Sequence, residues 1–183
     1  MWCSGWRLAH AVSSSGGLGV IGAGSMTPTL LTEHIGKIRA SQINNFAVNI
    51  PLMNKHADAH IQTVIKNKVP IVITSAGNPA SFTQKLKESG IKVLHVVSSC
   101  KFAIKAEKSG VDALIAEGFE AGGHNGREET TTLCLVPQIR KKCRLPLLAA
   151  GGIASGQSMF AVMSLGAEGV QIGSRYAVCE ESS

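Results

Sequence analysis

The sequence has few aromatic residues (4%) and few charged residues (16%), and it lacks any uninterrupted apolar run of about 18 residues. Without such a run, a helix that spans a membrane is not expected. The hydrophobic fraction of 44% argues in turn against a disordered chain. A length of 183 residues suits one domain with its own core, so we expect a single domain over residues 1–183.

Several patterns that carry known chemistry are also missing. The chain contains no P-loop, no nucleophile elbow and no Ser/Lys dyad. Its five cysteines are an odd number and include no CxxC pair, which predicts neither a disulfide framework nor a zinc site. Glu128 and Glu129 near His124 have no second histidine or cysteine at ligand spacing, so no metal is expected. Arg7 and His10 interrupt the N-terminal apolar stretch, which disfavours a signal peptide and predicts a cytoplasmic protein.

Positive charge is in excess but scattered. Eighteen Lys and Arg against twelve Asp and Glu give a net charge of +6. The one dense cluster, Arg140 to Arg144, has no interleaved aromatic residues, whereas single-strand binding surfaces combine the two. We therefore expect no nucleic-acid partner and only a mild attraction for small anionic molecules.

Short, almost continuously apolar runs alternate with segments of helical period. Seven runs are candidate strands: Leu18–Ile21, Phe46–Leu52, Val69–Ser75, Lys92–Ser98, Ala113–Glu117, Pro146–Ala150 and Gly169–Ile172. Continuous rather than alternating hydrophobicity is typical of parallel strands covered on both faces. The alternation predicts an α/β fold, and repeated βα units of similar length favour a TIM (β/α)8-type barrel over an open doubly wound sheet.

A Gly-Gly pair and a Gly-Ser pair follow the last two candidate strands. Gly151 and Gly152 come after Pro146–Ala150, and Gly173 and Ser174 come after Gly169–Ile172. The carboxyl ends of neighbouring parallel strands meet at one edge, where bare N–H groups and helix N-termini bind phosphate. Tight turns alone would also use glycine, but the repetition at two consecutive strands favours a phosphate site.

Two further motifs have competing interpretations. Residues 17–22 fit the dinucleotide pattern GxGxxG, but the apolar residues inside it read as the strand itself, and no acidic residue ends the next strand. His124 follows the Gly122–Gly123 pair beyond the strand Ala113–Glu117. A lone histidine is often structural, yet at the carboxyl end of a barrel strand it is a candidate general base or hydrogen-bond donor.

An ordered series of motifs resembles the nitronate monooxygenase family, formerly called 2-nitropropane dioxygenases, and its sister group, the FMN-dependent enoyl-acyl-carrier-protein reductases. The series runs through "GGLGVIG", "FAVNIPL", "AGNP", "AEGFEAGGH", "LLAAGGIASG" and "LGAEGVQIGSRY". The resemblance implies an FMN-binding TIM barrel in which Gly151, Gly152, Gly173 and Ser174 hold the phosphate. It further implies that Asn49, Glu117, Gly122 and Gln171 contact the flavin.

The resemblance also implies an activity. His124 matches the catalytic histidine of the family, which oxidises alkyl nitronates with O2 to a carbonyl compound and nitrite. The alternatives are an NAD(P)H-dependent enoyl-acyl-carrier-protein reductase, since that branch often carries Glu where Glu117 stands, and a non-catalytic flavin-binding fragment.

Against the family pattern the barrel is expected to be truncated and incomplete. A first strand of the type "PIIQGGM" and a C-terminal segment after residue 176 are missing. Unpaired parallel edges invite association, so a homo-oligomer is one expectation.

Overall fold

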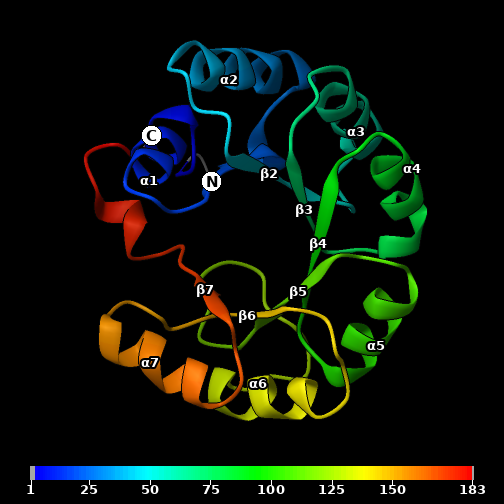
Figure 1. Cartoon of the computed structure of the whole chain (residues 1–183), viewed down its shortest axis with the longest axis vertical. Coiled ribbons are helices and arrows are strands. Elements are labelled where there is room, and N and C mark those ends of the chain that lie inside the picture. The colour runs from blue at the N-terminus through cyan, green and yellow to red at the C-terminus, as the bar shows by residue number, and fades with distance from the viewer. Residues whose placement is uncertain (1–2, 183) are drawn as a thin grey trace. The chain divides into compact units, whose positions relative to one another are not determined.

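The computed structural model describes residues 3–182, which fall into two compact units. Unit 1 comprises the described residues up to Val93 and from Ala177 on, and unit 2 comprises Leu94–Tyr176. Figure 1 shows the elements of both units in chain order.

Unit 1 is built on three parallel strands in the order β1-β2-β3. Its strands are β1 (Gly19–Gly22), β2 (Phe46–Pro51) and β3 (Ile71–Ser75), and its helices are α1 (Trp6–Ser14), α2 (Pro28–Ala40), α3 (Ala57–Lys66) and α4 (Thr83–Glu88). Two short 3-10 turns, η1 (Ala23–Ser25) and η2 (Pro79–Ser81), follow β1 and β3. Near the chain ends, the Ser182 hydroxyl donates to the Cys3 carbonyl.

The core of unit 1 follows from two periodicities. Leu31, Ile35 and Ile38 recur at helical spacing on α2 and are completely buried. On β2, successive residues from Phe46 to Val48 are buried on both faces of the sheet, as a parallel strand requires. Thr27 starts α2 because its side chain accepts from the Leu30 N–H and Pro28 occupies the first turn.

Unit 2 contains parallel strands in the order β4-β5-β6-β7. Its strands are β4 (Lys92–Val97, whose first two residues belong to unit 1), β5 (Ala113–Glu117), β6 (Leu147–Ala150) and β7 (Gly169–Gln171), and its helices are α5 (Cys100–Lys108), α6 (Thr132–Arg140) and α7 (Gly156–Ser164). A third 3-10 turn, η3 (Tyr176–Val178), follows β7, and its last two residues belong to unit 1. Helices α5, α6 and α7 cover one face of the strands β5, β6 and β7 (Figure 1).

The predicted strands agree with the described ones to within one or two residues at each end. Gly90, Gly110 and Gly166 all have positive φ angles at the ends of helices, the conformation of a C-terminal glycine cap. These caps turn each helix back into the next strand. The predicted α/β class with parallel strands is therefore confirmed within each unit.

Candidate functional site

The carboxyl ends of three neighbouring strands in unit 2 form one row of residues. Glu117 at the end of β5 is in register with Ala150 on β6, and Ala150 is in register with Gln171 on β7. Side chains in one row of a parallel sheet project from the same face. Glu117 and Gln171 thus face the same way from strands about 10 Å apart, because each strand spacing is about 4.8 Å.

Glu117 is the titrating group of this row. Burial raises the pKa of its carboxyl above the ordinary value of 4.5. A carboxyl of this kind keeps its proton to higher pH than a solvated one, so it can donate as well as accept a hydrogen bond. A raised pKa at a strand's carboxyl end is the kind of perturbation that marks functional sites.

The Gly151–Gly152 turn follows β6 directly. Both glycines have positive φ angles, +102° and +69°, and a Cβ on Gly151 would lie 2.8 Å from the Gly118 carbonyl oxygen. Only glycine fits this turn without strain. Successive residues of this conformation gather backbone N–H groups into a concave anion-binding nest.

The second predicted phosphate loop follows β7. A Cβ on Gly173 would meet no atom within 4 Å, so its backbone is open to an approaching ligand. Within the described part of the chain, the N–H groups of Gly151, Gly152, Gly173 and Ser174 donate no hydrogen bond. Four unbonded amides at the ends of two neighbouring strands fit a phosphate group.

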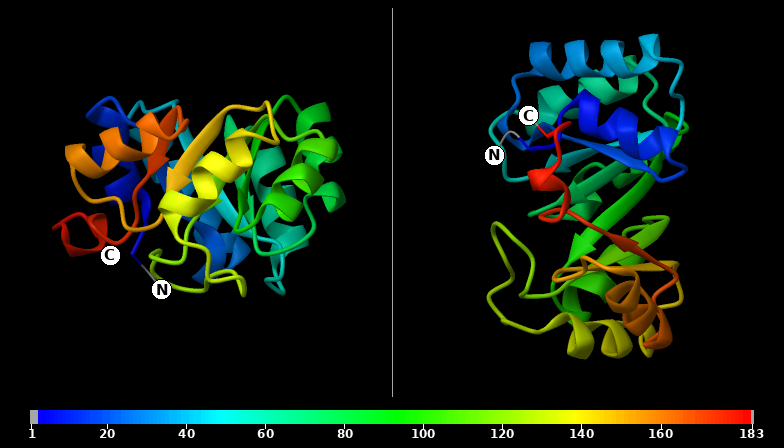
Figure 2. Two further views of the ribbon diagram at one scale, coloured as in Figure 1. Left: turned by 90° about the horizontal axis from the view of Figure 1, so that it is seen from below. Right: turned by 90° about the vertical axis from the view of Figure 1, so that its left-hand side faces the viewer.

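The loop after β5 approaches the loop after β7. A Cβ on Gly122 would come 2.8 Å from the Ser174 hydroxyl oxygen. The structure therefore brings Gly122 beside Ser174, as a site shared by the two loops would require. Figure 2 shows this loop, in yellow-green, as a long excursion between β5 and α6.

His124 lies on the same excursion. Its side chain is exposed, and it makes no hydrogen bond with any residue between 3 and 182. The structure confirms its place on the loop beyond β5, while its role at a substrate stays a prediction.

The sequence reasoning missed two residues of this region, Glu120 and Thr132. A carboxylate oxygen of Glu120 accepts from the Thr132 N–H at 2.9 Å and lies 3.0 Å from the Thr132 hydroxyl. Burial raises the pKa of Glu120, but hydrogen bonds from the Thr132 N–H, its own N–H and the Thr132 hydroxyl outweigh burial and leave it below the ordinary value. Two sequence signals could have pointed to them: the second acid of "EGFE", which is Glu120, and the threonine run Thr130–Thr132 at a helix start.

Asn49 belongs to unit 1. Its side-chain amide donates to the Ile73 carbonyl at 3.3 Å and lies 3.4 Å from the Ser75 hydroxyl. These contacts tie the amide of β2 to the neighbouring strand β3. Its predicted contact with a flavin stays a prediction.

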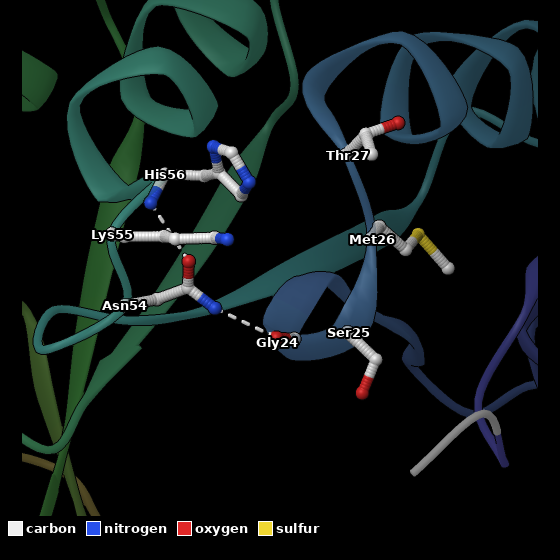
Figure 3. Close-up of a pocket in the computed structure, with 7 residues that line it drawn as sticks. All are labelled: Gly24, Ser25, Met26, Thr27, Asn54, Lys55 and His56. Carbon is white, nitrogen blue, oxygen red and sulfur yellow. Dashed lines mark hydrogen bonds between the residues drawn. The ribbon is translucent and has the colours of Figure 1, made fainter.

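A pocket of about 310 Å³ lies in unit 1 beyond the ends of β1 and β2 (Figure 3). It is lined by Gly24, Ser25, Met26, Thr27, Asn54, Lys55 and His56. Asn54 spans the two loops, because its amide donates to the Gly24 carbonyl at 2.7 Å and its oxygen accepts from the His56 N–H at 2.8 Å. The side chains of Lys55 and His56 give the pocket basic character.

Neither a metal-binding cluster nor a membrane-spanning helix occurs among the described residues. Between residues 3 and 182, no group of three or more His, Cys, Asp and Glu side chains is placed to bind a metal ion. None of the described helices combines the length and the apolar character needed to cross a bilayer.

Comparison with known proteins decides the family. The family model for nitronate monooxygenase matches residues 1–60 and 41–183. The chain belongs to the nitronate monooxygenase family. A probable nitronate monooxygenase of Staphylococcus aureus (strain MSSA476) is 34% identical over 97% of this chain and 62% of its own length.

Two solved structures extend the comparison across the fold. FabK from Thermotoga maritima has a TM-score of 0.95 and 45% identity over 100% of this chain and 58% of its own. Nitroalkane oxidase from Streptomyces ansochromogenes has a TM-score of 0.89 and 28% identity over 99% of this chain and 64% of its own. The chain thus spans about three fifths of these relatives. The predicted fold, a TIM-type barrel with fewer than eight strands, is confirmed for the described residues.

Proposed function

We propose that this chain is the FMN-binding part of a flavin-dependent oxidoreductase. The observation that carries the proposal is the pair of loops after β6 and β7, which present four backbone N–H groups that donate to no residue between 3 and 182. The phosphate monoester at the end of the ribityl side chain of FMN matches these N–H groups in charge and in hydrogen-bonding capacity. The N-terminus of α7, which begins at Gly156, follows the first loop and adds to its positive potential.

Different residues of unit 2 would bind different parts of this cofactor. Gly151, Gly152, Gly173 and Ser174 would bind the phosphate. Glu117 and Gln171 would hydrogen-bond the flavin from one row, with Gly122 beside the Ser174 loop.

Asn49 of unit 1 is a further residue that we propose to contact the flavin.

FMN, when bound, supplies the one- and two-electron redox chemistry that side chains lack. The protein's part is to orient the substrate and supply or hold a proton.

The first candidate reaction is oxidation of an alkyl nitronate by O2 to a carbonyl compound and nitrite. Its support is the family model and the Staphylococcus aureus relative. A nitronate carries its negative charge on two oxygen atoms. His124 would donate a hydrogen bond to one of them and so polarise the nitro group.

The second candidate is reduction of an enoyl thioester by NAD(P)H, the chemistry of the related enoyl reductases. One observation favours it: identity to FabK is 45%, against 34% for the Staphylococcus aureus relative and 28% for the nitroalkane oxidase. The resemblance adds that the reductase branch often carries Glu where Glu117 stands. On identity this candidate is the stronger one. His124 would then supply the proton that the substrate takes up when the double bond of its enoyl group is reduced.

The electron donor separates the two candidates. The full chain is loaded with FMN and mixed under anaerobic conditions with NADH, with NADPH, or with propionate 3-nitronate, while the visible flavin absorbance is followed. Bleaching by the nitronate alone supports the oxidase, and bleaching by a nicotinamide alone supports the reductase. No bleaching by any donor would contradict the proposed oxidoreductase.

A control separates donor chemistry from binding. His124→Ala should retain FMN and lose turnover with the true substrate. Glu128→Gln, on the same loop, removes a carboxylate 3.5 Å from the Ser98 hydroxyl and should leave turnover unchanged.

A further inference from the structure

Thr132 contacts the Gly151–Gly152 turn from the start of α6. Its side chain is buried, with 3% of the residue exposed. The hydroxyl donates to the Gly151 carbonyl at 2.9 Å and lies 3.3 Å from the Ala150 carbonyl. The Ala150 carbonyl also accepts from the Gly118 N–H at 2.9 Å.

These contacts fix the direction of two backbone amides. In a trans peptide unit, the C=O of one residue and the N–H of the next point in opposite directions. Holding the Ala150 carbonyl therefore turns the Gly151 N–H away from Gly118 and Thr132. In the same way, holding the Gly151 carbonyl turns the Gly152 N–H away from Thr132.

Both amides are therefore aimed at the side where no described residue accepts from them. The glycine conformation alone does not secure this arrangement, because glycine residues rotate freely between peptide orientations. The Thr132 hydroxyl supplies the missing restraint on the Gly152 N–H. The Gly118 N–H supplies the restraint on the Gly151 N–H.

Glu120 in turn holds Thr132. One of its carboxylate oxygens accepts from the Thr132 N–H at 2.9 Å. The Thr132 hydroxyl lies 3.0 Å from the same carboxylate oxygen, so its one proton is shared between Glu120 and the Gly151 carbonyl, which at 2.9 Å is the nearer of these two acceptors. A Cβ on Gly118 would come 2.1 Å from the Thr132 hydroxyl oxygen. Only glycine at position 118 therefore leaves room for the Thr132 hydroxyl beside the Gly151 carbonyl.

We propose that Thr132 is a positioning residue that orients the Gly152 N–H for a phosphate monoester and so makes the chain prefer FMN to riboflavin. The inference rests on the proposed function, because it concerns the same cofactor site. Thr132 does not touch the cofactor in this account; it acts through the peptide unit between Gly151 and Gly152.

The test compares two flavins that differ only in the phosphate. Dissociation constants for FMN and for riboflavin are measured on the full chain by flavin fluorescence, for the wild type, Thr132→Val and Thr132→Ser. In Thr132→Val, the Kd for FMN should rise about tenfold, the loss expected for one hydrogen bond that aligns a backbone N–H donor toward a charged phosphate. The Kd for riboflavin should change less than about twofold, and Thr132→Ser should keep the wild-type ratio.

Thr131→Val is the matched control, since Thr131 is exposed and its hydroxyl makes no capping hydrogen bond. It should leave both constants unchanged. Circular dichroism checks folding, and if Thr132→Val does not fold, Thr132→Ala replaces it.

Three outcomes would contradict the inference, and they can be told apart. An unchanged ratio of the two constants in a folded variant, with a wild type that prefers FMN, overturns the role of Thr132 alone. A wild type that binds neither flavin overturns the proposed function and this inference with it. An equal loss of both flavins would show a purely structural role and also overturn the inference.

Discussion

Glu117 and Gln171 lie in the same row of the unit 2 sheet, one on each side of Ala150. The two side chains end β5 and β7, the strands on either side of β6, and they share a face of the sheet because parallel register requires it. Between them, the strand of Ala150 leads into the glycine turn. This one row therefore joins the proposed flavin-contacting side chains to the proposed phosphate loop.

The row gives a pH-dependent prediction for Glu117. Burial raises the pKa of its carboxyl above 4.5 in the folded chain. Between pH 4.5 and this raised pKa, the folded chain therefore holds more protons than the unfolded chain. Wild-type stability should then fall as the pH rises through this window. Glu117→Gln should lack this fall, and urea unfolding of flavin-free protein from pH 4 upward measures both. Parallel pH profiles for the two proteins would contradict the assignment.

Gly151→Ala should damage the turn and the flavin site together. The new Cβ would need a φ of +102° and would approach the Gly118 carbonyl to 2.8 Å. A side chain held in such a conformation costs about 1–3 kcal/mol. The free energy of unfolding in urea should fall by that order, and FMN should bind more weakly.

Gly156→Ala is the control for Gly151→Ala. Gly156 begins α7, and a Cβ there would meet no atom within 4 Å. Its unfolding free energy should stay the same or rise slightly, since alanine restricts the unfolded chain. Equal losses for both variants would show that the turn has no special requirement for glycine.

His60 in unit 1 should make stability fall in acid. Burial lowers the pKa of this imidazole below 6.5, the hydrogen bond with the Met26 carbonyl at 3.0 Å opposes the shift, and nearby His56 adds to it. As the pH falls below 6.5, the unfolded chain takes up a proton before the folded chain does, so stability is lost. Thermal unfolding at pH 5.0 and 7.5 should show a smaller difference for His60→Gln than for the wild type. An equal difference would rule out His60 as the source.

His124→Ala should separate catalysis from cofactor binding. The side chain is exposed on the loop after β5 and makes no hydrogen bond with a described residue, so its loss should leave the fold intact. Turnover of the true substrate should fall about 100-fold, the usual contribution of a general acid or base. Steady-state kinetics and FMN titration measure the two effects, and unchanged turnover would remove His124 from the catalytic role.

Much of the fold could be predicted from local sequence signals. Phe46 to Ile50 and Ala113 to Ala116 read as buried parallel strands because both faces are apolar. The glycines at 90, 110 and 166 read as helix caps because only glycine adopts a positive φ without cost. These signals lie within a few residues of the structure they determine.

The parts of the site that depend on distant partners could not be predicted in this way. Glu117 and Gln171 were identified by resemblance, but their common row depends on the register of three strands. Thr132 reads as a helix start, whereas its contact with Gly151 joins residues 19 positions apart in sequence. No spacing rule encodes which carbonyl a buried hydroxyl meets.

The central claim, that this chain holds FMN on its strand-end loops, is tested most directly by equilibrium dialysis of the full chain against FMN. The claim predicts about one FMN per chain at saturation, with weaker binding by Gly151→Ala and unaltered binding by Gly156→Ala. A wild-type chain that is folded by circular dichroism and retains no FMN would contradict it.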